Sequence, residues 1–236
     1  MPNMESGIPR IVQDIETKSF AKQDVYHNTL EAFQQCKKVV QQTVDDLQEA
    51  LRGKDHEVDI SLEEPSTYEL RLKIAGDIIL FTMHSNVFNF DEQHSIHQSA
   101  YVKEDPTRAY CGSIQVYNFL ADSFKFNRLT DLGYLIARVF LNKENHFFVE
   151  GHRQLGFLYN DFDNFVLNDI YIRAIVEACI QYSLDFDLIA PPFEATRQIS
   201  VQAMQLMSMQ AGWKTSKIPG YKLSFMDEDE ENRPIG

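Results

Sequence analysis

The segment TYELRLKIAGDIILFTMHSNVF, residues 67–88, decides the fold class. Apolar or aromatic residues at positions 68, 70, 72 and 74 alternate with charged ones, the period of two that buries one side of a strand. A second apolar run follows Gly76-Asp77. A glycine at the first position of a two-residue loop suits a type II′ turn, and type I′ is also compatible. The segment therefore predicts a β-hairpin with Gly76-Asp77 as its loop.

This loop would set the register of the hairpin, with Leu72 opposite Phe81 and Leu70 opposite Met83. One face is then wholly apolar or aromatic and consists of Tyr68, Leu70, Leu72, Ile74, Ile79, Phe81 and Met83. The other face is charged far from the loop, whereas close to the loop it is apolar at Ala75, Ile78 and Leu80. We therefore expect the second face to be solvated at one end and covered at the other.

Composition limits the class of protein. Hydrophobic residues make up 44% of the 236, enough for a core, so the body of the chain is not disordered. The net charge of −13 argues against a nucleic-acid partner, because phosphate contacts need clustered Lys and Arg. No apolar run reaches the roughly 18 residues of a membrane span, and the first residues lack a signal-peptide pattern. Three widely spaced cysteines fit a cytoplasmic protein, and we expect no membrane partner.

A long helix is predicted from about residue 16 to 52, because Gly53 is the first Pro or Gly after residue 9 and suits a helix stop. We expect residues 1–15 to form a flexible arm. The helix carries a seam with steps of four and three, made of Tyr26, Leu30, Phe33, Lys37, Val40, Val44, Leu47 and Leu51. Such a seam forms either a coiled-coil homodimer or a stripe that packs on the protein's own sheet. Neighbouring apolar residues widen the stripe and favour packing on the sheet.

The remaining elements complete an α+β domain over residues 16–226. Strands are predicted between 58 and 151, among them 113–120, 132–141 and 146–150. Helices are predicted at 163–183 and 194–211, and residues 227–236 form an acidic tail. This order of elements indicates a curved, mainly antiparallel sheet of five to seven strands in meander order, with a long N-terminal helix and two C-terminal helices.

One group of residues resembles a metal site. His94 and His97 are three residues apart, Asp91 precedes them, and His84 lies on the preceding strand. A zinc or iron ion needs three or four such nitrogen and oxygen ligands at about 2 Å. The alternative is that the histidines are solvated in a polar loop, since two-histidine spacings are frequent by chance.

A second group is a candidate ligand site. Glu150, His152 and Arg153 place an acid, a base and a cation at the end of the last strand, and Arg138 lies on the neighbouring strand. A charge among apolar residues needs a partner, so Arg138 pairs either with an internal carboxylate or with a ligand anion. The internal carboxylate is the favoured partner.

No catalytic signature is present: the chain has no phosphate loop, no G-x-S-x-G and no H-E-x-x-H, and we identify no catalytic residue. We therefore expect a non-enzymatic interaction or ligand-sensing module that self-associates as a homodimer or binds a protein partner, with a small-molecule ligand as a further candidate and without a cofactor. The alternative is a metal-dependent enzyme that uses the histidine group at 84–97.

Overall fold

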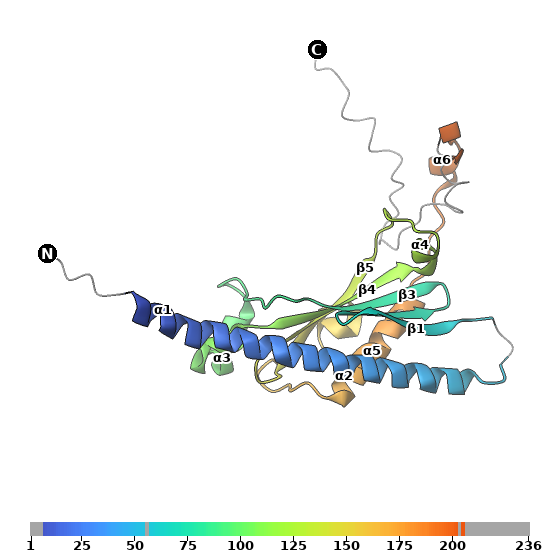
Figure 1. Ribbon diagram of the computed structural model, residues 1–236. Coiled ribbons are helices and arrows are strands. Elements are labelled where there is room, and N and C mark those ends of the chain that lie inside the picture. The colour runs from blue at the N-terminus through green and yellow to red at the C-terminus, as the bar shows by residue number, and fades with distance from the viewer. Residues whose placement is uncertain (1–6, 55–56, 203, 206–236) are drawn as a thin grey trace, which may run out of the picture.

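The computed structural model describes residues 7–54, 57–202 and 204–205. It contains one six-stranded antiparallel sheet whose strands follow one another in sequence order, a long N-terminal helix and helices later in the chain (Figure 1). The predicted α+β class and the meander order are thus confirmed. None of the helices in this part of the chain combines the length and the hydropathy that a bilayer-spanning segment needs.

The strands are β1 Ile60–Ser66, β2 Glu69–Ile74, β3 Asp77–Met83, β4 Gly112–Leu120, β5 Tyr134–Leu141 and β6 Phe147–Gly151. The outer edge of β6 is covered, because the backbone N–H groups of Phe147 and Val149 donate to carbonyls at Phe165 and Tyr159. The opposite edge, β1, carries exposed Glu63, Glu64 and Pro65 and a bulge between Glu63 and Ser66. Charge, proline and a bulge each disfavour the pairing of an edge with another strand.

The predicted loop of the first hairpin is wrong by one residue. Ala75-Gly76 forms the turn, so Leu72 lies opposite Ile79 and Leu70 opposite Phe81. A slip of one residue in the turn moves the pairing by two residues, and a shift of two preserves which face each side chain occupies. Contacts outside the hairpin hold this turn: the N–H of Ala75 donates to the carbonyl of Asp59, and the carbonyl of Gly76 accepts from Ala121. They hold Ala75 at φ +52°, a left-handed conformation that local preference assigns to glycine.

The core lies between one face of the sheet and two helices, α2 (Phe20–Leu51) and α5 (Asp169–Leu184), which lie on the same side in Figure 1. Phe33, Val40 and Val44 of the predicted seam are buried there, against the apolar face of the hairpin. The seam therefore packs on the protein's own sheet. Lys37, which interrupts the seam, pairs with Glu64 and donates to the carbonyl of Ser66 at 3.1 Å.

The second face of the sheet is covered at both ends. Residues 84–110, with the short helices η2 (Ser95–Gln98), α3 (Ala100–Glu104) and η3 (Pro106–Ala109), close over one end and form a smaller core with Phe140 and Phe148. At the other end, the ring of Phe124 in α4 (Ala121–Lys125) packs edge-on against Phe119, with ring centroids 5.4 Å apart. The expected cover near the hairpin loop is thus present.

The N-terminal helix begins earlier than predicted. It consists of α1 (Ile8–Asp14), a π-helical segment η1 (Ile15–Ser19) and α2. Residues 8–15, for which we predict a flexible arm, are helical in the structure, and a proline in the first turn is compatible with a helix that begins there. Residues 1–6 of that arm lie outside the described residues. Gly53, at φ +76°, ends the helix as predicted.

The C-terminal helices also differ from the prediction. The loop before α5 bonds to the β5–β6 hairpin through the carbonyl of Phe165 and the N–H of Leu167, so α5 begins at Asp169 rather than at residue 163, with Asn168 as its cap. The helix predicted at 194–211 is interrupted: α6 covers only Phe193–Thr196, and residues 197–200 are not helical. No residue described between 193 and 205 is buried, so nothing supports a longer helix. Residues 206–211 and the acidic tail lie outside the described residues.

We expect Lys37→Met to lower the free energy of unfolding by about 1 kcal/mol, because Met fills the buried space but leaves the Ser66 carbonyl without its donor. The association state should not change, since these contacts lie within one chain. Urea unfolding and light scattering measure the two effects, and Lys38→Met, at the exposed neighbouring position, is the control. An increase in dimer for Lys37→Met alone would contradict the packing of the seam on the sheet.

Candidate functional site

The structure does not assemble the predicted metal group. Nδ1 of His84 accepts from the N–H of Asn86 at 3.0 Å, and Nδ1 of His94 accepts from the N–H of Ile96 at 3.3 Å. These contacts are local to the loop and cap its turns. The ring of His94 also stacks on Phe90, with centroids 4.6 Å apart.

The other two residues of this group have local contacts of the same kind. Nε2 of His97 lies 3.3 Å from the carbonyl of Phe90, and the carboxylate of Asp91 accepts from the N–H of Gln93. Across the described ranges, no three His, Cys, Asp or Glu residues form a group that could hold a metal ion.

Arg138 and Glu150, two of the predicted ligand-binding residues, form an ion pair on adjacent strands. The favoured internal partner of Arg138 is thereby confirmed. The pair ends a polar row in which neighbouring strands place these residues side by side: Glu69, Thr82, Gln115, Arg138 and Glu150. All five are partly exposed on the second face, in the stretch between its two covered ends.

His152 and Arg153 contact the end of α5 instead. The ring of His152 stacks on Tyr134 and Tyr182, with centroids 5.0 and 5.6 Å apart. Arg153 pairs with Asp185 at 2.7 Å, and its guanidinium lies over the ring of Tyr182. Burial, together with the hydrogen bond to Tyr134, raises the pKa of Tyr182 to about 12. The four predicted residues thus form two separate pairs of contacts, each with partners inside the chain.

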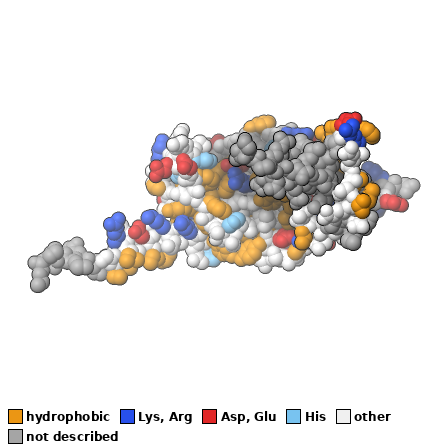
Figure 2. All heavy atoms as spheres, turned by 90° about the horizontal axis from the view of Figure 1, so that it is seen from above, with side chains coloured by type: hydrophobic (Ala, Val, Ile, Leu, Met, Phe, Trp, Pro, Cys, Tyr) orange, Lys and Arg blue, Asp and Glu red, His pale blue; other side chains and the backbone are white. Residues whose placement is uncertain are grey.

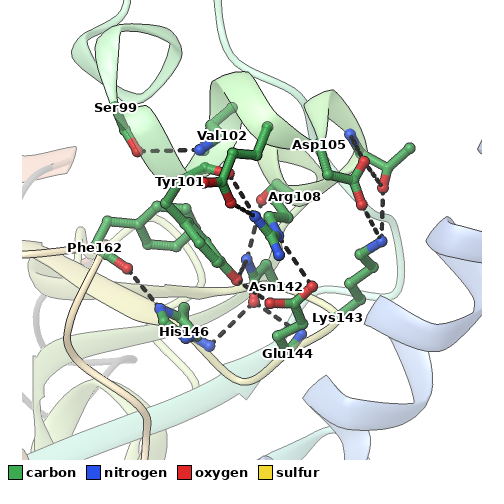
Figure 3. Close-up of polar contacts among 12 residues, drawn as sticks. Ser99, Tyr101, Val102, Asp105, Arg108, Asn142, Lys143, Glu144, His146 and Phe162 are labelled. Atoms are coloured by element: carbon green, nitrogen blue, oxygen red, sulfur yellow. Dashed lines mark hydrogen bonds and ion pairs between the residues drawn. The ribbon is translucent and has the colours of Figure 1, made fainter.

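Sequence reasoning missed a polar network around Asn142, which Figure 3 shows. Its amide donates to the hydroxyl of Tyr101 and to the carbonyl of Arg108, and its carbonyl oxygen accepts from the N–H groups of Glu144 and His146. Asn142 is fully buried, so each of these bonds satisfies a group that has lost water. The sequence indicates only a turn here, between the strands predicted at 132–141 and 146–150, and a turn does not imply a network.

The same network joins residues 99–108 to the β5–β6 turn (Figure 3). Arg108 bonds to Glu144 at 3.0 Å and lies over the ring of Tyr101, whose hydroxyl donates to Glu144. Lys143 donates to Asp105 at 2.6 Å and to Thr107 at 2.8 Å. These groups are engaged with one another, which is typical of a structural latch that holds the covering segment 84–110 on the sheet.

The three cysteines offer no nucleophile. Cys36, Cys111 and Cys179 are all free thiols and all buried. Burial raises the pKa of Cys36 to about 12 and also raises the pKa of Cys111 and Cys179. A thiol whose thiolate is disfavoured is a weak nucleophile.

The start of the N-terminal helix is a further exposed surface. Every residue from Gly7 to Phe20 is exposed, and the helix projects beyond the sheet in Figure 1. Residues 8–20 are called the helical arm below. Five of its side chains are large, apolar and between 45 and 61% exposed: Ile8, Ile11, Val12, Ile15 and Phe20. Figure 2 shows hydrophobic side chains along one edge of this projection and charged ones along the other.

The π-helical segment aligns the last of these side chains with the rest. Ile8, Ile11, Val12 and Ile15 have helical spacing and share one face. In an unbroken α-helix Phe20 would lie on another side, five residues after Ile15. Here the N–H of Phe20 bonds to the carbonyl of Ile15, because a π-helix takes more residues in each turn. Phe20 therefore follows Ile15 along the axis and extends the apolar stripe.

The helical arm has little stability of its own. Helices shorter than about 12–15 residues are marginal in water, and β-branched residues such as Ile and Val lower helix propensity further. Most of the stability of a helix in a protein comes from packing an apolar face. An exposed stripe on a helix without tertiary cover is therefore typical of a surface that binds another molecule.

Neither protein-family models, nor curated proteins, nor solved structures match this chain. The functional conclusion rests on its own residues.

The Asp105 carboxylate gives the latch a pH dependence. Hydrogen bonds from Lys143 and Thr107 lower the pKa of Asp105 to about 2. A lowered folded-state pKa contributes stability at neutral pH that is lost as pH falls from about 4 toward 2. We expect Asp105→Asn to destabilise the protein at pH 7 and to match the wild type progressively below pH 4, as urea unfolding would show. Asp187→Asn, at an exposed connector position, is the control; equal profiles for both variants would contradict the latch.

The thiols provide a second test of the site. We expect the folded protein to react with a thiol reagent such as Ellman's reagent only after denaturation, when three thiols per chain become accessible. Absorbance at equilibrium in buffer and in denaturant measures this. Rapid reaction of one thiol in the folded protein would show a reactive cysteine and reopen the question of a nucleophile.

Proposed function

We propose that this protein is a non-enzymatic interaction module that self-associates, and that the helical arm is its binding surface. One observation carries the proposal: five large apolar side chains share one side of the helical arm, in which every residue is exposed. Such a surface fits binding by apolar contact. The five apolar side chains themselves carry no nucleophile, metal ligand or general base.

Two other surfaces suit self-association less well. The seam at 26–47 is engaged with the protein's own sheet, so a coiled coil through it would have to expose the core. The β1 edge carries Glu63, Glu64 and Pro65, which disfavour strand pairing. The helical arm is therefore better suited to self-association than the seam or the β1 edge.

Two further expectations belong with this proposal. Three free thiols support a cytoplasmic location, because cysteines stay reduced there. A ligand-sensing role gains no specific support from Arg138, Glu150, His152 and Arg153, which are engaged within the chain. Among the described residues nothing favours the alternative of a metal-dependent enzyme.

We expect the wild type to show a mass that rises from monomer toward dimer over the micromolar range, measured by light scattering or sedimentation. The double variant Ile11→Glu with Ile15→Glu should remove this rise in mass. It adds two negative charges to each stripe, and therefore four to a pair of stripes in contact. The matched control is Gln13→Glu with Thr17→Glu, which adds the same charge to the polar side of the arm and should keep most of the association. A wild type that stays monomeric up to about 100 μM, a concentration at which such weak pairs associate, would refute self-association.

A further inference from the structure

We infer that the helical arm binds the arm of a second copy of this chain, and that the two arms lie antiparallel. This inference rests on the proposed function and adds to it the partner, the surface on the partner and the orientation. It depends on three features: the charge of the arm, its length, and the positions of its apolar side chains.

The charge of the arm fits a second copy. Arg10 and Lys18 balance Asp14 and Glu16, so the arm is neutral, whereas the whole chain has a net charge of −13. All of that net charge therefore lies outside the arm. A basic partner would gain nothing electrostatic from a neutral helix and would bind the acidic body instead. Two acidic copies, in contrast, repel each other least where they meet through neutral segments.

The length of the arm decides the orientation. At a rise of about 1.5 Å per residue the arm is about 20 Å long. Parallel pairing would bring both acidic bodies together at the same end. Antiparallel pairing places them at opposite ends, about 20 Å apart, which exceeds two Debye lengths of about 8 Å at physiological salt. Antiparallel helices also bring opposite ends of their dipoles together.

The positions of the apolar side chains suit that orientation. The stripe begins at Ile8, ends at Phe20 and has Ile11, Val12 and Ile15 between. When one arm is reversed on the other, Ile8 lies opposite Phe20 of the second copy, and Ile15 lies opposite Val12. The π-helical segment allows Phe20 to lie opposite Ile8 of the second copy, because in an unbroken α-helix Phe20 would point away from the stripe. Two such short helices bury less surface than a standard interface, so the pairing is weak and reversible.

Cross-linking tests the orientation. Single variants Ile8→Cys and Phe20→Cys are prepared as full chains, reduced, mixed and oxidised mildly, and the products are separated by intact mass. The native thiols are buried, so the introduced thiol is the accessible one, and the wild type is the control for background. Antiparallel arms predict that disulfides between Ile8→Cys and Phe20→Cys exceed either homodimer several-fold. The central stripe of Ile11, Val12 and Ile15 is intact in both variants.

The other outcomes separate this inference from the proposed function. A dominant Ile8→Cys homodimer would show parallel arms and overturn the inference while self-association stands. A wild type that is dimeric by scattering, with no cross-link beyond background in any mixture, would place the interface elsewhere and overturn it as well. A monomeric wild type would overturn the proposed function itself.

Salt dependence provides an independent readout. Because salt screens the repulsion between acidic bodies and leaves apolar contacts in place, we expect the dimer fraction to rise as ionic strength increases from about 0.05 to about 0.5 M. The same series with Ile11→Glu and Ile15→Glu should stay monomeric. A dimer fraction that falls with salt would show attraction between opposite charges and would overturn pairing through neutral arms.

Discussion

The rest of the structure depends on the burial of one sheet face beneath two helices. Residues of α2 and α5 meet the apolar face of β2, β3 and the later strands, and each large side chain buried there contributes roughly 1.5–3 kcal/mol. The sheet sets how much of the N-terminal helix can be buried. From Ala21 onward the helix packs on the sheet face. Residues 8–20 extend past the sheet, and none of their side chains is buried. The same helix therefore stabilises the fold along most of its length and presents a surface at its start.

The second face of the sheet is shielded from solvent over part of its area. The segment between β3 and β4 closes over Phe140 and Phe148, and a hydrogen-bonded network fastens it to the β5–β6 turn. Asn142 at the centre of that network is fully buried, whereas the ion-pairing side chains around it are partly or largely exposed. Within this network, hydrogen bonds from Lys143 and Thr107 lower the pKa of Asp105, and burial raises the pKa of Tyr101. The polar row from Glu69 to Glu150 is what this cover leaves accessible.

Periodicity along the chain was sufficient to predict the class, the strand order and which side of each hairpin strand faces the core. A period of two is a property of the strand itself. The prediction of which side chains share a face therefore stayed correct even though the turn was assigned one residue late. The turn could not be predicted because Asp59 and Ala121, distant in the sequence, hold Ala75 in a conformation that favours glycine. The start of α5 was misplaced for the same reason, since the loop before it bonds to a hairpin. For the metal group the limit was of another kind, because a spacing of histidines says nothing about where their nitrogens point. In the structure, Nδ1 of His84 and Nδ1 of His94 each accept from a backbone N–H two residues later.

The helical conformation of residues 8–15 was not predicted, because Pro2, Gly7 and Pro9 are typical of a loose segment. Helix formation there continues from α2, which is already ordered by the sheet, so the nucleation cost that limits an isolated helix has been met. Continuation alone does not explain why the exposed face holds five large apolar side chains and a π-helical segment that brings the last of them into line. In the proposed dimer, the two copies would meet through a segment whose charges sum to zero, although the whole chain has a net charge of −13. In the proposed dimer, apolar contact over a short stripe is opposed by electrostatic repulsion between the two acidic bodies, so we expect both protein concentration and salt to shift the association.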